Sequence, residues 1–209
     1  MAFITLDNYK NYVGKMSPEQ KKVLTKYFCV SGCLGSLGAM KDEDYDAMVD
    51  EKVKALNLKQ KALNKIGLDE SEVNEIAPVN FYGWDDDDSK NTLTGKVGRD
   101  GEYRTSRYQV SWLFFSSTQV YLYSYTIDML FNKSSERTEE YFYKDITNFS
   151  TNSESKEYTI GKNTVTAQKA EFQIVVPGDK MRLAITGMNM EEVERSLQAM
   201  KQKLREKKM

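Results

Sequence analysis

From Tyr103 to Met209 the chain alternates apolar and polar residues in short runs that are separated by turn residues. This period of two predicts antiparallel strands with one buried face. The clearest hairpin covers residues 172–185, where two alternating runs flank Pro177-Gly178-Asp179, a sequence that suits a type II turn. From Asn189 onward, apolar residues at steps of three and four predict an amphipathic helix. The order favours a small β-barrel or sandwich closed by a C-terminal helix.

The first 78 residues follow a helical pattern instead. Ser17 and Gln20 form a capping-box pair around Pro18, which predicts that a helix begins there. We expect Asp42 to cap a second helix, and residues 58–66 to form a third that ends at Gly67. The sequence therefore predicts an α+β protein with a helical region over 1–78 and a β-rich domain over 79–209.

The composition excludes several kinds of site. The chain has no histidine, which rules out Ser-His-Asp and Cys-His catalysis and any histidine-ligated metal. Its two cysteines, Cys29 and Cys33, lie one helical turn apart and lack further ligands, so we interpret them as small buried residues. With 30 basic and 31 acidic residues, the chain has no net field that would attract nucleic acid. We predict no metal, no cofactor and no nucleic-acid partner.

The location of the protein can also be inferred from composition. The N-terminus lacks the basic and apolar regions of a signal peptide. The most apolar stretch, residues 27–40, is shorter than the roughly 20 residues that span a bilayer, so we expect no transmembrane segment. Two cysteines fit a reducing compartment. The sequence predicts a cytoplasmic protein that could also be peripheral to the membrane.

An acidic run, Asp85 to Asp88, interrupts the chain between the helical and the β-rich regions. With Ser89 it is similar to the first half of an EF-hand loop. However, Lys90 stands where that loop needs glycine, and Lys96 stands where it needs a bidentate glutamate. The run is therefore either a cation site or a solvated break, and the sequence leaves both open.

The stripe formed by Tyr121, Tyr123 and Tyr125 also has two interpretations. Exposed aromatic side chains favour protein interfaces, so the stripe could be a recognition surface. It could equally lie on the inner face of the sheet or beneath the N-terminal helices, in which case it is core.

Three phrases in the second half of the chain resemble those of bacterial pleckstrin-homology-like (PH-like) domains, including the GRAM type. They are Thr105-Ser106-Arg107-Tyr108, Tyr143-Lys144-Asp145-Ile146-Thr147 and Leu183-Ala184-Ile185-Thr186. The resemblance covers about residues 92–209 and rests on element order more than on residues. It implies a PH-like antiparallel β-barrel of six or seven strands capped by a C-terminal α-helix, a fold that serves binding more often than catalysis.

The resemblance also implies a candidate ligand site. Many PH domains bind phosphoinositides through basic residues of the first hairpin, which here correspond to Lys96, Arg99, Arg104 and Arg107. Convergent Arg and Lys side chains suit phosphate. The acidic residues nearby, from Asp85 to Asp88 and at Asp100 and Glu102, would repel an anionic headgroup. The alternative is that the four basic residues are ordinary solvated charges.

Three functional hypotheses follow. The first is a non-enzymatic PH-like module that binds a protein or peptide, since the chain has no Walker loop, dinucleotide fingerprint or nucleophile elbow. The second is a peripheral membrane adaptor that binds acidic lipid headgroups through the four basic residues. The third, an enzyme with a carboxylate-based site, would need acids without basic partners in a deep pocket. We assign no catalytic residue, and the oligomeric state is not predicted.

Overall fold

The computed structural model describes residues 4–30, 38–73, 76–85, 94–160 and 163–185, together with residues 194, 197, 198, 201, 202, 205 and 206. The helical elements are α1 (Lys10–Val13), α2 (Pro18–Val23), the π-helical turn η1 (Leu24–Phe28), α4 (Asp42–Ala55), α5 (Leu58–Ile66) and the 3-10 turns η2 (Glu70–Val73) and η3 (Tyr143–Asp145). The strands are β1 (Ile76–Trp84), β2 (Gly95–Val97), β3 (Tyr103–Thr105), β4 (Arg107–Phe115), β5 (Gln119–Asp128), β6 (Ser134–Phe142), β7 (Asn148–Ile160), β8 (Asn163–Val176) and β9 (Asp179–Ala184).

The helix starts were predicted with mixed success. The capping box at α2 is confirmed, because Gln20 N–H donates to Ser17 Oγ (3.2 Å) and Ser17 N–H donates to Gln20 Oε1 (2.8 Å). The prediction that Asp42 caps α4 is wrong, since Lys41 is the N-cap and Asp42 is the first helical residue. The Asp42 carboxylate instead accepts hydrogen bonds from the Tyr27 hydroxyl and from Arg99 N–H. These two groups, distant in the sequence, replace the N–H of the first helical turn that was expected to bond Asp42.

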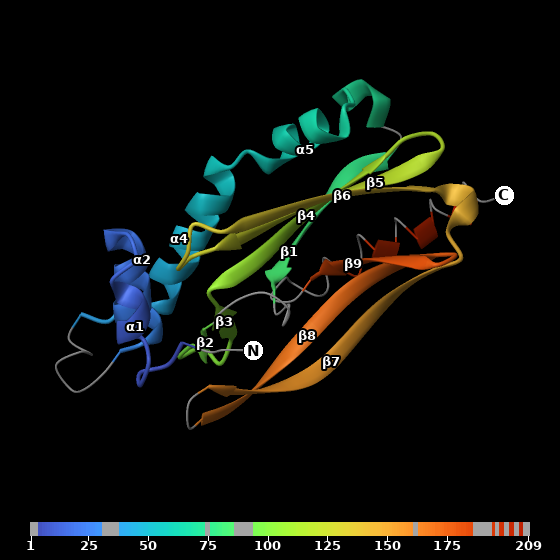
Figure 1. Ribbon diagram of the computed structural model, residues 1–209. Coiled ribbons are helices and arrows are strands. Elements are labelled where there is room, and N and C mark those ends of the chain that lie inside the picture. Colours follow the sequence, from blue (N-terminus) through green and yellow to red (C-terminus); the bar gives the residue numbers. More distant parts are fainter. Residues whose placement is uncertain are drawn as a thin grey trace.

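Among the described residues, the strands form three antiparallel sheets (Figure 1). The first sheet has the order β1-β4-β5-β6, and the second sheet has the order β7-β8-β9. A small hairpin, β2-β3, stands apart from both. The predicted α+β class is therefore correct, with helices before the β-rich part of the chain.

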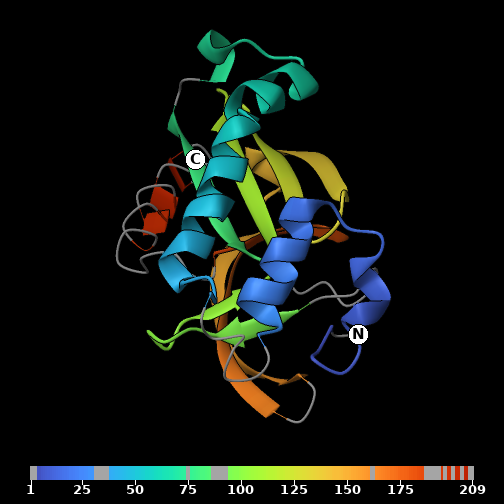
Figure 2. The same ribbon diagram turned by 90° about the vertical axis from the view of Figure 1, so that its left-hand side faces the viewer.

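The first sheet lies between the helices and the second sheet (Figures 1 and 2). Its outer face carries Val110, Phe114 and Tyr123, which pack with Leu58 and Leu63 of α5. Tyr123 is fully buried there. Of the two interpretations of the tyrosine stripe, the structure supports core beneath the N-terminal helices.

The two sheets share an apolar core at one end of the molecule. It includes Phe81, Leu113 and Leu122 of the first sheet and Phe172 and Leu183 of the second sheet. In each strand these residues alternate with others, as period two requires. The predicted 172–185 hairpin is confirmed as β8-β9, and Gly178 in its turn has φ of 82°, a value that favours glycine.

The predicted closed barrel is not seen: within the described ranges, no backbone hydrogen bond joins β1 or β6 to the second sheet. Side chains bridge the sheets instead, because Arg137 Nη2 donates to the Arg182 carbonyl (3.2 Å) and Ala184 N–H donates to Gln109 Oε1 (3.1 Å). Polar side chains thus occupy the place where a backbone ladder would close the barrel. The predicted C-terminal helix lies mostly outside the described residues. Of that segment, Leu197 is buried in the shared core.

The N-terminal helices belong to a second core. Tyr27 and Tyr45 stack with their ring centroids 4.1 Å apart, and the Tyr45 hydroxyl donates to the Thr105 carbonyl (2.6 Å). Trp84 and Tyr158, from the two sheets, join the same cluster. The predicted boundary at residue 78 falls inside β1. None of the helices in the described part is long and apolar enough to span a membrane.

Candidate binding cleft

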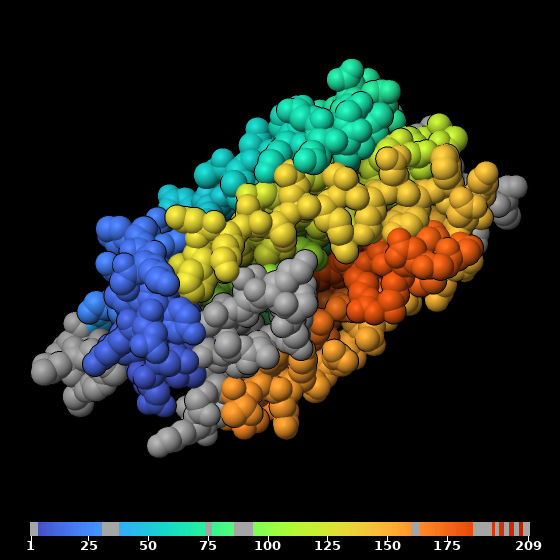
Figure 3. Space-filling view, viewed as in Figure 1, coloured from blue at the N-terminus to red at the C-terminus, as the bar shows by residue number. Residues whose placement is uncertain are grey.

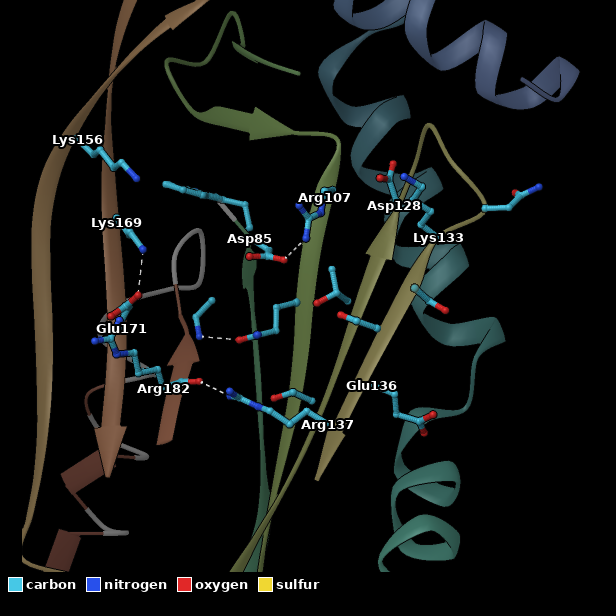
Figure 4. Close-up of a pocket in the computed structure, with 18 residues that line it drawn as sticks. Asp85, Arg107, Asp128, Lys133, Glu136, Arg137, Lys156, Lys169, Glu171 and Arg182 are labelled. Carbon is cyan, nitrogen blue, oxygen red and sulfur yellow. Dashed lines mark hydrogen bonds and ion pairs between the residues drawn. The ribbon is translucent and has the colours of Figure 1, made fainter. Parts of the chain in front are cut away.

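A cleft of about 1160 Å³ lies between the two sheets, beside their shared core. The described part of its lining comes from β1, β4, β5 and β6 of the first sheet and from β7, β8 and β9 of the second sheet (Figure 4). At the surface, β6 and the second sheet form two neighbouring bands, yellow and orange in Figure 3. Ligand pockets for small molecules usually occupy about 300–1,000 Å³, so this cleft has room for a larger ligand.

Strand alternation explains why the cleft is polar. Along β4, Arg107 and Gln109 occupy the same face as Leu113, so the inner face of the first sheet changes from polar to apolar along its length. In the second sheet, Glu171 lines the cleft whereas its neighbour Phe172 belongs to the shared core. The cleft and the core therefore contact opposite faces of β8. The second sheet therefore presents a charged face to the cleft.

A buried ion pair lies at the end of β1. Arg107 Nη2 and Asp85 Oδ2 are 2.6 Å apart, and their side chains are only 7% and 14% exposed. Asp85 N–H also donates to the Arg107 carbonyl, which fixes the two segments to each other. Arg107 thus has a short, direct carboxylate partner within the protein.

Asp128 is the cross-strand partner of Arg107 and is also buried, with 3% of its surface exposed. Its Oδ1 accepts hydrogen bonds from Leu130 N–H (2.8 Å) and Phe131 N–H (3.1 Å), whereas its buried Oδ2 has no hydrogen-bond partner among the described residues. The nearby ammonium of Lys52 donates to the Asp128 backbone carbonyl rather than to the carboxylate. Burial therefore raises the pKa of Asp128 to about 6, despite the two backbone donors and Arg107.

This carboxyl group makes the stability depend on pH. An unfolded Asp has a pKa of about 3.9, so between about pH 4 and 6 the folded state holds a proton that the unfolded state has lost. Stability falls as pH rises through that window. Asp128→Asn should increase the free energy of unfolding by about 1–3 kcal/mol at pH 7.5 and by little at pH 4. Urea titrations at both pH values test this, and an equal effect at both would contradict it.

Two arginines meet at the other end of the cleft. Arg137 of β6 and Arg182 of β9 approach each other there, and Lys169 of β8 pairs with Glu171 at 3.0 Å (Figure 4). Arg137 also pairs with Glu139 at 3.1 Å. Arg182 is exposed. Taken over the whole cleft, six of the described lining residues are basic and four are acidic.

The four basic residues predicted as a ligand site do not form one group. Arg107 lines the cleft, whereas Lys96 and Arg104 lie on the β2-β3 hairpin against α4. The Lys96 ammonium is 3.6 Å from Asp42 and 3.8 Å from the centroid of the Tyr27 ring. Burial lowers the pKa of Lys96, and Asp42 opposes that shift. Lys96 therefore links the β2-β3 hairpin to the helices through Asp42 and Tyr27.

Arg104 and Arg99 also join the hairpin to α4. The Arg104 guanidinium bonds both oxygens of Asp46 (2.8 Å each) and both oxygens of Asp100 (2.9 and 2.6 Å). Its side chain is only 11% exposed. Arg99 contributes its backbone N–H to Asp42 at 2.8 Å. Acidic side chains from α4 and the hairpin thus accept the hydrogen bonds that the Arg104 guanidinium was predicted to donate to a phosphate.

Some of the acidic side chains that line the cleft already have basic partners. Asp85 pairs with Arg107, and Glu171 pairs with Lys169. Within the ranges that the structure describes, no three acidic or cysteine side chains gather to hold a metal ion. The acidic run from Asp86 to Asp88 lies outside the described residues, as does Cys33, while Cys29 is buried.

Sequence reasoning identified Arg107 but missed Asp128, Arg137 and Arg182. A signal was present: Asp128 ends an apolar strand run, and Arg182 is the charged residue between Met181 and Leu183 in an alternating run. Neither signal says which strands face each other. The cleft forms only where strands of the two sheets do so, and therefore it was missed.

No protein-family model matches this chain, and neither a curated protein nor a solved structure is similar to it. The geometry and charge of the cleft are therefore the basis for inferring a function.

Proposed function

We propose that this chain is a non-enzymatic, PH-like binding module that holds a peptide segment of a partner protein. The element order supports the PH-like part of the proposal, because a four-stranded and then a three-stranded antiparallel sheet follow each other along the chain. Leu197, from the segment after the last strand, is buried against both sheets. This is where a helix that closes a PH-like fold would pack.

The cleft is the observation that carries the peptide-binding function. Its volume of about 1160 Å³ exceeds that of usual small-molecule pockets, and its walls offer charges and backbone edges from both sheets. A peptide can use such a site over several residues, with main-chain bonds for affinity and side-chain contacts for specificity. The lipid alternative has less support, because carboxylates already occupy the Lys96, Arg104 and Arg107 side chains.

The test is a selection of displayed random peptides on the intact protein, followed by affinity measurements on two variants. Ser135 is exposed and lines the cleft, so Ser135→Tyr should fill part of it and weaken selected peptides by about tenfold or more. Thr138, exposed on the same strand and paired with the outer-face residue Tyr123, gives the matched control Thr138→Tyr.

We expect Thr138→Tyr to change affinity by less than about twofold. Failure to select any peptide, or equal effects of the two tyrosines, would contradict the proposal. Salt-sensitive co-sedimentation with anionic vesicles, lost in an Arg104→Glu variant, would favour the lipid adaptor instead.

A further inference from the structure

The outer edge of β9 faces the first sheet without a strand partner. Ile185 N–H donates to the Ala170 carbonyl of β8, so the alternate residues Lys180, Arg182 and Ala184 direct their backbone groups away from β8. Within the described ranges, no backbone bond joins this edge to another strand. An edge strand of this kind is a template for pairing with another chain.

Side chains occupy part of this edge. Ala184 N–H donates to Gln109 Oε1 (3.1 Å), the Arg182 carbonyl accepts from Arg137 Nη2 (3.2 Å), and Lys180 N–H donates to Asp179 Oδ1 (2.7 Å). Each of these partners is a side chain that rotation can withdraw. The edge is therefore partly hydrogen-bonded in the free protein and can exchange these bonds for those of an incoming strand.

Long side chains of the opposite wall reach across the cleft to this edge. β6 and β9 are connected by long side chains, since the Tyr141 hydroxyl donates to Asp179 Oδ2 (2.8 Å) and Arg137 reaches Arg182. Arg182 and Ala184 both line the cleft, so the edge opens into its volume. An extended hexapeptide is about 20 Å long, and a strand needs only one free edge to dock.

The charges beside the edge indicate what the strand should carry. Arg137 and Arg182 come from opposite walls, and Glu171 lies between Arg182 and Lys169 in Figure 4. Glu171 pairs with Lys169 and Glu139 pairs with Arg137, which leaves the exposed Arg182 guanidinium without an ion-pair partner in the described part of the chain. Acidic side chains complement this end of the cleft.

We propose that an extended, acidic peptide segment of a partner protein pairs with the outer edge of β9 inside the cleft, in place of the bonds from Gln109 and Arg137. This inference rests on the proposed function and names the ligand class and the docking strand. The peptide backbone bonds Arg182 and Ala184, and its acidic side chains meet Arg182 and Arg137.

The probe is an N-acetylated, C-amidated hexapeptide of alternating valine and glutamate, titrated against the full chain by calorimetry. Two further versions carry N-methyl groups on one or the other alternate set of amides. Because an edge-pairing strand directs only one set toward its partner, we expect one methylated version to lose binding and the other to keep it within about twofold. A valine-lysine hexapeptide should bind at least about tenfold more weakly.

Protein variants locate the contact. Arg182→Glu should weaken the glutamate peptide by about tenfold or more, whereas Lys144→Glu, an equal change of charge at an exposed site of η3 outside the cleft lining, should change affinity by less than about twofold. Equal effects of both variants, or equal binding of the two methylated peptides, would overturn the docking mode.

The two proposals fail differently. If selected peptides respond to Ser135→Tyr but not to alternate N-methylation or to Arg182→Glu, the cleft binds peptides without using the β9 edge, and this inference is wrong. If no peptide binds the protein, both proposals are wrong.

Discussion

Tyr45→Ala should lower the free energy of unfolding by about 3–5 kcal/mol, among the largest effects expected of any single substitution in this protein. Tyr45 is fully buried, stacks on Tyr27 and bonds the Thr105 carbonyl, so it joins α4 to α2-η1 and to the β-rich region. Removing it leaves a cavity and an unsatisfied carbonyl. Guanidinium titration measures the change.

Two other variants make this result specific. Tyr45→Phe keeps the ring and loses the hydroxyl, which donates to the Thr105 carbonyl and also contacts the Tyr108 side chain; this loss should cost about 1–3 kcal/mol. Phe142 is 49% exposed, so Phe142→Ala should cost no more than about 0.5 kcal/mol. If Tyr45→Ala unfolded in two steps with the β-rich region unaffected, the N-terminal helices would be an independent unit, contrary to the shared core.

Arg107→Met should be comparably destabilising, by about 3–5 kcal/mol at pH 7.5. The substitution removes the guanidinium that pairs with the buried carboxylate of Asp85, and it removes the cation whose charge acts on Asp128. The double variant Asp85→Asn with Arg107→Met removes a charge from each side of the pair. It should recover more than half of the loss, because residue 85 is then neutral and its burial no longer depends on the charge of Arg107.

The single variant Asp85→Asn completes the comparison. Arg107 and Asp128 are cross-strand partners, so the arginine can turn to Asp128 when Asp85 loses its charge. We therefore expect Asp85→Asn to cost clearly less than Arg107→Met at pH 7.5. Equal costs, or a double variant no better than Arg107→Met, would show that the pair is not the source of the stability.

Local patterns in the sequence predicted the elements whose stabilising contacts are also local. The capping box of Ser17 and Gln20 depends on residues three apart, and the β8-β9 hairpin depends on a turn that needs glycine at position 178. Asp42 was mispredicted because its carboxylate bonds Tyr27 and Arg99, one of them from a distant hairpin, instead of a neighbouring N–H. Helix caps compete with such distant partners, and the sequence does not indicate which one is preferred.

The closed barrel was mispredicted for a related reason. Alternation places Glu171 and Phe172 on opposite faces of β8, but it does not say which face meets the first sheet. The side chains of Gln109 and Arg137 occupy the edge of β9 where a backbone ladder would close the barrel. Likewise, the basic residues Lys96 and Arg104 were predicted to bind a ligand, but α4 supplies acids that already neutralise them.

The most direct test of the central claim uses the two tryptophan indole N–H signals in a nitrogen-15 NMR titration with a selected peptide. Trp84 lines the cleft, whereas Trp112 packs on the outer face of the first sheet near α5, so the protein carries its own probe and its own control. Trp112→Phe assigns the signals. Peptide binding in the cleft predicts that the Trp84 signal shifts with saturation while the Trp112 signal stays in place. Binding that shifts Trp112 and leaves Trp84 unchanged would contradict the claim that the cleft between the sheets is the binding site.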